Sequence, residues 1–253
     1  MSIINSCDLE SKPLVGIEDF IEKGDLGVEC CIVAFSHHVL ELVLNTYKCE
    51  NVGHSGTANG HIEIYKFNDN GKDFLFYMSP IGSCVSTMTM HEVAYLTGAK
   101  KFIVYGSCGI LNKELCEHKL IVPTSAYRDE GTSYHYLKES DFIDIKNYKI
   151  IADIFSKLNY PYILGKTWTT DAIYMETKNK VLEKRKLGCV SVEMEASGLQ
   201  SICDYYGYEL YTFYFGGDVF DDLSWDKSNL GGLKERDIQR NVFKIALELA
   251  RNI

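Results

Sequence analysis

Two acidic residues lie close together in an apolar part of the chain, in the segment Val192-Glu193-Met194-Glu195-Ala196. Residues 188–192 before them predict a strand, and residues 196–206 after them predict a helix. Side chains two positions apart in an extended segment share a face, so we expect both carboxylates to point the same way. Buried acids need a polar partner, and a sugar diol is one. The alternative is a helix N-terminus, which explains one acid better than two.

Polar groups also follow two other apolar strands. Residues 101–105 predict a buried strand that ends at Gly106-Ser107-Cys108-Gly109, where glycines allow close approach and Ser107 with nearby N–H groups can donate to an anion. A tight turn is the alternative. Residues 210–215 predict a strand that ends at Gly216-Gly217-Asp218. Asp218 is well placed for acid–base chemistry, although a turn or helix-capping Asp would look the same.

An aromatic ring among hydroxyl groups marks residues 167–171, Thr-Trp-Thr-Thr-Asp. We interpret Trp168 as a platform for a planar base, with a buried structural Trp as the alternative. Residues 127–136 are dense in polar and aromatic groups, which is typical of a functional or interface loop.

The elements that position these residues alternate along the chain. Apolar runs predict strands at 29–34, 62–67, 73–79, 101–105, 119–123, 188–192 and 210–215. Amphipathic runs predict helices at 38–47, 88–97, 148–158, 183–186, 196–206 and 235–251. Such alternation favours a mainly parallel sheet covered on both faces, with ligands beyond the carboxyl ends of its strands. Four prolines and no linker-like tract favour one domain over residues 1–253.

Composition excludes several classes of function. The formal net charge of −9 argues against nucleic acid or an anionic membrane surface as the main partner. No apolar run is long enough to span a bilayer, and residues 1–12 lack a signal-peptide core, so we expect a cytoplasmic protein. The nine cysteines form no CxxC pair, and we expect most to be reduced core residues rather than disulfide partners or metal ligands.

Taken together and in this order, the motifs resemble those of the nucleoside phosphorylase family. That family includes bacterial purine nucleoside phosphorylase, uridine phosphorylase and the methylthioadenosine nucleosidases. The resemblance runs from about residue 31 to residue 226, and it depends on GSCG at 106–109, RDEGTSYHY at 128–136, TTDAIY at 169–174, VEMEA at 192–196 and GGD at 216–218.

The resemblance implies a single three-layer α/β/α domain around a mixed, partly barrel-like sheet. It implies cleavage of the N-glycosidic bond of a nucleoside, with phosphate as co-substrate and with no metal or organic cofactor. Met194 and Glu195 would hold the ribose with help from Glu193, and Trp168 would contact the base. The segment Gly106, Ser107, Cys108 and Gly109 would hold phosphate, and Asp218 would protonate the leaving base.

The sequence departs from the family pattern where phosphate is bound. An Arg usually follows the first strand, but residues 34–39 here contain none, and Val104 replaces a second Arg. His37, His38, Arg128 or a residue of a neighbouring subunit could substitute. A hydrolytic nucleosidase and a uridine phosphorylase therefore stay open as alternatives to phosphorolysis of a purine nucleoside. The resemblance also implies a homo-oligomer, either a dimer or a trimer of dimers, with residues 127–136 as a candidate contact.

Overall fold

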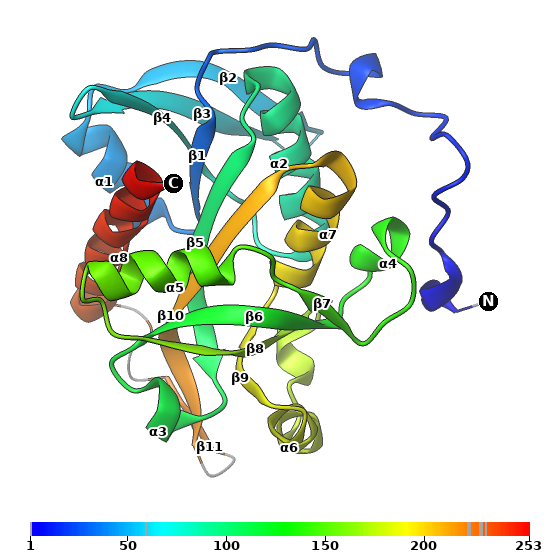
Figure 1. Cartoon of the computed structure of the whole chain (residues 1–253), viewed down its shortest axis with the longest axis vertical. Helices are drawn as coiled ribbons and strands as arrows, with labels where there is room; N and C mark the ends of the chain where they lie inside the picture. Colours follow the sequence, from blue (N-terminus) through cyan, green and yellow to red (C-terminus); the bar gives the residue numbers. More distant parts are fainter. Residues whose placement is uncertain (1, 59, 222–223, 228–229, 231) are drawn as a thin grey trace.

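The computed structural model describes residues 2–58, 60–221, 224–227, 230 and 232–253 (Figure 1). The strands in these ranges are β1 (Cys30–Ala34), β2 (Glu50–Thr57), β3 (Gly60–Asp69), β4 (Lys72–Met78), β5 (Lys101–Ile110), β6 (Leu120–Asp129), β7 (Phe142–Asp144), β8 (Tyr162–Thr170), β9 (Cys189–Glu193), β10 (Glu209–Asp221) and β11 (Ser224–Asp226).

Helices of two kinds connect and cover these strands. The α-helices are α1 (His37–Thr46), α2 (Ser83–Thr97), α3 (Lys113–Cys116), α4 (Ser133–Tyr136), α5 (Tyr148–Lys157), α6 (Lys178–Lys186), α7 (Ala196–Tyr206) and α8 (Gly232–Asn252), and the short 3₁₀ turns are η1 (Ile3–Asn5), η2 (Ile17–Asp19) and η3 (Ile173–Met175). α2 and α6 begin earlier than the sequence predicts. The hydroxyl of Thr177 caps α6 by accepting a hydrogen bond from the N–H of Lys180.

The sheet is mixed, and part of it closes on itself. Its strands follow the order β11-β10-β6-β8-β9-β5-β1-β4-β3-β2, and an additional pairing joins β10 to β5. Strands β5, β10, β6, β8 and β9 therefore form a closed five-stranded barrel, while β1 to β4 extend it as an open sheet. This confirms the predicted α/β fold with a mixed, partly barrel-like sheet. The pairings of β1 with its neighbours are parallel, whereas β3 pairs with β2 and β4 in the antiparallel sense.

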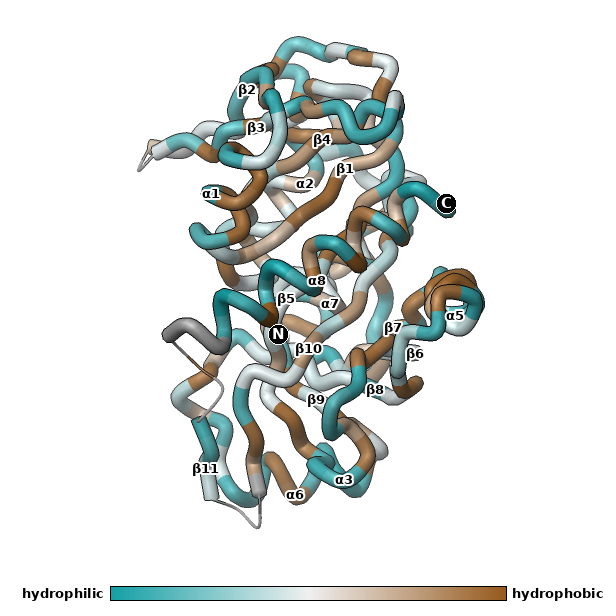
Figure 2. Tube along the Cα trace, turned by 90° about the vertical axis from the view of Figure 1, so that its left-hand side faces the viewer, coloured by the Kyte–Doolittle hydropathy of each residue, from teal (hydrophilic) through white to brown (hydrophobic). Residues whose placement is uncertain are grey.

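Two helical layers sandwich the open part of the sheet (Figure 1). On one face, apolar side chains of α1 and α8 join alternate residues of β1 such as Ile32 in one cluster, and α5 extends this cluster over β6, β8 and β10. On the other face, α2 and α7 pack against the intervening residues, including Cys31 and Val33. Because both faces of β1 are covered, its whole sequence is apolar, and the strand is drawn as hydrophobic in Figure 2. Six of the nine cysteines are buried, as predicted: Cys30, Cys31, Cys108, Cys116, Cys189 and Cys203.

Strands β5 and β10 run further than the sequence predicts. β5 continues through the glycine motif to Ile110, and β10 continues through Gly216-Gly217-Asp218 to Asp221. A Cβ atom on Gly109 would lie 2.7 Å from a methyl carbon of Val192, so the absence of a side chain lets β9 approach β5. The glycines therefore serve barrel closure rather than ending the strands. The register of β10 against β5 shifts between Gly216 and Asp218, as in a β-bulge.

No helix in the described part of the chain combines the length and apolar character needed to cross a membrane.

Candidate functional site

A cavity of about 250 Å³ lies at the end of the barrel where β5, β9 and β10 meet. Eight of the nine residues predicted from the sequence line it: Gly106, Ser107, Cys108, Gly109, Glu193, Met194, Glu195 and Asp218. Val192 and Ile173 add two further motif residues to the lining. Residues outside the motifs complete it: Phe35, Ile81, Glu176, Tyr214, Trp225 and Leu230. The structure thus brings the motifs at 106–109, 192–196 and 216–218 together around one cavity.

Strand β5 lies between β9, which leads to Glu193 and Glu195, and β10, which carries Asp218. Gly109 is paired with Val192 of β9 on one side and with Asp218 of β10 on the other. The acids that follow Val192 and the acid of β10 therefore reach the cavity from opposite sides of the glycine motif. This placement follows from barrel closure, which brings β9 and β10 to the two edges of the same strand.

Both carboxylate oxygens of Glu193 accept hydrogen bonds, and the residue is only 5% exposed. Oε2 accepts hydrogen bonds from the N–H groups of Glu195 (2.7 Å) and Ala196 (2.6 Å), and Oε1 accepts one from the hydroxyl of Thr169 (2.6 Å). Burial raises the pKa of this carboxyl to about 7, although these donors oppose the shift. Glu193 therefore caps the start of α7, so the helix N-terminus interpretation holds for this one acid.

We expect Glu193→Ala to lower the free energy of unfolding by about 2 kcal/mol, because it leaves backbone donors at the start of α7 unpaired. Glu193→Gln keeps one carbonyl acceptor in place and should lose less. Urea unfolding of the two variants and the native protein checks this. Equal stability of Glu193→Ala and the native protein would contradict the capping role.

Glu195 differs from Glu193 in what it contacts. Its Oε1 atom accepts a hydrogen bond from the N–H of Gly82 (2.7 Å), just before α2, and the side chain is 8% exposed. Burial, followed by the charge of Glu193, raises the pKa of Glu195 to about 8. The neighbouring Met194 accepts a hydrogen bond from the Ser83 hydroxyl through its carbonyl oxygen. Contacts from the start of α2 therefore fix this strand-to-helix junction at the wall of the cavity.

Asp218 is held by a residue that the sequence motifs do not contain. The indole Nε1 of Trp225, on β11, donates a hydrogen bond to Oδ2 of Asp218 at 2.6 Å. Burial raises the pKa of Asp218, and the Trp225 bond opposes that shift. Trp225 is 56% exposed and lines the cavity, so its ring is accessible to a ligand. Its position seven residues after GGD, among several acids, is the signal that the sequence offers for it.

Glu176 is a fourth acid of the cavity and lies directly after η3. Burial, and then the charge of Asp218, raise the pKa of Glu176 to about 7, whereas Lys180 has the opposite effect. No Lys, Arg or His is found among the described residues that line the cavity. The charged side chains among the described lining residues are therefore all acids.

The structure does not bring Trp168 to the cavity. Its neighbours Thr167 and Thr169 face Glu193, and because side chains alternate along β8, Trp168 points to the opposite face. There it is fully buried among apolar residues beneath α6, and its Nε1 donates to Asp129 at 3.1 Å. We therefore correct its predicted role, because a ring with no exposed surface cannot stack on a base.

This difference between the two tryptophans gives a fluorescence prediction. We expect a purine base to quench the emission of a Trp168→Phe variant, whose remaining indole is Trp225 at the cavity wall. A Trp225→Phe variant, whose remaining indole is the buried Trp168, should respond little. Titration of both variants with the base measures this, and an equal response would contradict the placement of Trp225 in the site.

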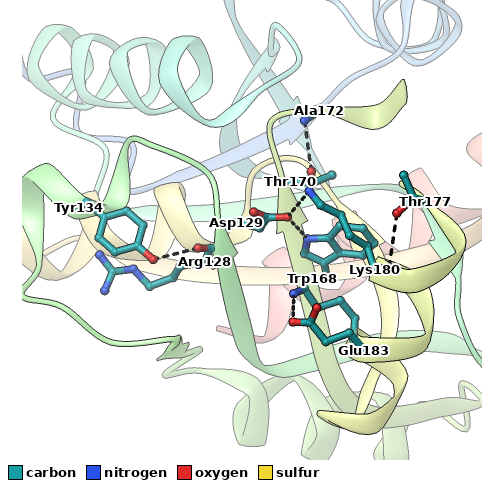
Figure 3. A network of polar contacts seen from close by, with 10 residues as sticks. Arg128, Asp129, Tyr134, Trp168, Thr170, Ala172, Thr177, Lys180 and Glu183 are labelled. Atoms are coloured by element: carbon teal, nitrogen blue, oxygen red, sulfur yellow. Dashed lines mark hydrogen bonds and ion pairs between the residues drawn. The ribbon is translucent and has the colours of Figure 1, made fainter. Parts of the chain in front are cut away.

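The candidate substitutes for the missing arginines lie elsewhere. Arg128 is 3% exposed and donates to Ser133, Ser140 and the carbonyls of residues 137, 138 and 140, so it holds the 127–140 segment together. Figure 3 shows Arg128 beside Tyr134, away from Trp168. His37 and His38 are exposed at the start of α1 and do not line the cavity.

A larger cavity of about 520 Å³ lies between α3, β10 and α8. Most of its lining side chains are apolar, and of the motif residues its described lining includes Gly216 but none of the nine candidate site residues. The smaller acidic cavity is therefore the candidate site.

Comparisons with known proteins agree with this geometry. The sequence model described as the Phosphorylase superfamily matches residues 29–237. A DeoD-type purine nucleoside phosphorylase of Caldanaerobacter subterraneus subsp. tengcongensis is 23% identical over 84% of this chain and 89% of its own length. The Clostridium novyi protein of the same name is 26% identical over 63% of this chain and 68% of its own.

A third relative, the DeoD-type enzyme of Colwellia psychrerythraea, is 29% identical over 44% of this chain. The chain spans about half of that relative's length (48%). The superfamily match covers most of the chain and includes every motif that lines the cavity. By that match, this chain is a member of the Phosphorylase superfamily.

Proposed function

We propose that the chain cleaves the N-glycosidic bond of a purine nucleoside with phosphate as nucleophile and releases the free base and ribose 1-phosphate. The observation that carries this proposal is the arrangement of Glu195 and Asp218, which line one cavity from the two sides of β5. The names of the relatives, which are purine nucleoside phosphorylases, support the same reaction.

The proposed chemistry assigns a role to each end of the cavity. A phosphate oxygen forms a bond to C1′ of the sugar while the bond from C1′ to the base nitrogen breaks, and the electron pair moves onto the base. Asp218 donates a proton to the base, which becomes a neutral leaving group. Glu195 accepts hydrogen bonds from the sugar hydroxyls, and the acids of the lining, in their ionised form, stabilise the positive charge that develops on the sugar.

Phosphate binding in this proposal depends on the glycine motif of β5. Ser107 is exposed to the cavity and supplies a hydroxyl donor, and Gly106 and Gly109 leave room for an anion near the backbone. We propose that a second copy of the chain, in a dimer or a trimer of dimers, supplies the cation that the described lining lacks.

Hydrolysis is the second candidate, because an acidic cavity without a described cation disfavours an anionic nucleophile. Incubation of purine nucleosides and of uridine with and without phosphate, followed by chromatography, separates the alternatives. Ribose 1-phosphate that forms only with phosphate is the expected result. Free ribose at equal rates in both conditions would favour the hydrolase, and a strong preference for uridine would reject the purine assignment.

A further inference from the structure

Glu176 is a cavity residue to which the proposed reaction gives no task. It lies after η3, outside every motif, and lines the same cavity as Asp218. It lines the cavity together with Asp218 and Trp225, the two residues placed against the base, and the charge of Asp218 acts on it. Oδ2 of Asp218 accepts the hydrogen bond from Trp225, while Oδ1 lies on the side of Gly109. Two carboxyl groups and one aromatic ring are therefore available to a base in this cavity.

The edge of a purine that carries N7 also carries the substituent at C6. In adenine this edge presents an acceptor at N7 and an amino donor at C6, whereas in 6-oxopurines it presents two acceptors. If Asp218 serves N7, Glu176, which lines the same cavity, can reach the C6 substituent on the neighbouring part of that edge. One carboxylic acid and one carboxylate match the acceptor and donor of adenine, but a carboxylate facing the oxygen of a 6-oxopurine would be repelled.

We propose that Glu176 selects the base by accepting a hydrogen bond from the C6 amino group, so that the cavity prefers 6-aminopurine nucleosides over 6-oxopurine nucleosides. This inference rests on the proposed function and gives it a substrate class. Glu176 acts on specificity, while proton donation to the base remains with Asp218.

The ionisation of Glu176 gives this preference a pH dependence. The charged groups that act on it are Asp218 from β10 and Lys180 from α6, and Lys180 is itself paired with Asp129 at 3.2 Å. The pKa of Glu176 is raised to about 7, so the carboxylate that accepts the amino hydrogen bond becomes dominant as the pH rises through that value. Below it, the protonated acid can donate to a 6-oxo group instead. Preference for adenosine over inosine should therefore increase with pH.

The test compares kcat/KM for adenosine and inosine across about pH 6 to 8.5 in the native protein and in Glu176→Gln. We expect the adenosine-to-inosine ratio to rise with pH in the native protein. In Glu176→Gln the ratio should be independent of pH and about 10-fold lower at high pH, because an amide both donates and accepts. Glu139→Gln removes the charge of an exposed acid and should behave as the native protein does. A native-like ratio and pH profile in Glu176→Gln would overturn the proposal.

Calorimetric titration with free adenine and free hypoxanthine distinguishes failure of this inference from failure of the proposed function. If no nucleoside is cleaved but adenine binds more tightly than hypoxanthine, and Glu176→Gln abolishes that difference, base selection stands and the proposed reaction fails. If nucleosides are cleaved but the two bases bind equally in both proteins, the reaction stands and base selection is wrong. If neither base binds, both are wrong.

Discussion

Glu195→Ala is expected to lower kcat/KM for a purine nucleoside by about 100- to 10,000-fold, because each hydrogen bond to a charged acceptor contributes about 1.5–3 kcal/mol. The carboxylate lies at the cavity wall, held through Oε1 by the N–H of Gly82. Its loss removes the partner of the sugar hydroxyls and, above about pH 8 where the carboxyl of Glu195 is ionised, a negative charge near the developing positive charge. Steady-state kinetics with purified protein measures the effect.

A nucleoside that lacks one sugar hydroxyl serves as the matched control for Glu195. The native protein should already cleave it more slowly. Glu195→Ala should lower kcat/KM for this substrate by a smaller factor than for the full nucleoside, because fewer hydrogen bonds remain to be lost. Thermal unfolding of the variant separates loss of binding from loss of fold. Equal losses on both substrates, in a folded protein, would contradict the assignment of Glu195 to the sugar.

Asp218→Ala is expected to lower kcat for purine nucleosides by about 100- to 10,000-fold, the range typical of general acid catalysis. Burial raises the pKa of Asp218 and so favours the protonated form that a general acid needs. Pyrimidine nucleosides have no imidazole ring for this acid to protonate, so the variant should lose less activity on them. Rates on both substrate classes, in the native protein and in Asp218→Ala, measure the difference.

A purine nucleoside methylated at N7 is a second control for Asp218. Its base already carries a positive charge and leaves without receiving a proton, so Asp218→Ala should cleave it at close to the native rate. Loss of activity on this substrate equal to the loss on ordinary purine nucleosides would show that Asp218 positions the base or supports the fold instead.

Much of the candidate site could be predicted from the sequence, because its motifs lie on strands whose ends the fold brings together. Eight predicted residues line the cavity, and closure of the barrel explains why segments separated by about a hundred residues meet. The sequence predicts that β5 and β10 end several residues before they do in the structure. Glycine usually interrupts a strand, but Gly109 and Gly216 lie at close contacts with Val192 and Ile110 where the strands continue.

Some residues could not be placed from the sequence, because a motif does not show which face of a strand each of its side chains occupies. Neighbouring hydroxyl groups favour a base-binding role for Trp168, but the hydroxyls of Thr167 and Thr169 lie on the opposite face of β8. Trp225 lies on the short strand β11 and Glu176 directly follows η3, and both residues fall outside the motifs. Which of two neighbouring strand residues faces a cavity depends on register, and register is fixed by pairing across the sheet.

A crystal structure of the protein with a bound purine nucleoside tests the central claim most directly. We expect the sugar hydroxyls to contact Glu195 and Met194 and the base to lie between Asp218 and Trp225, within the cavity bounded by β5, β9 and β10. A nucleoside seated in the larger apolar cavity between α3 and α8, with the carboxylate of Glu195 left without a sugar contact, would contradict it.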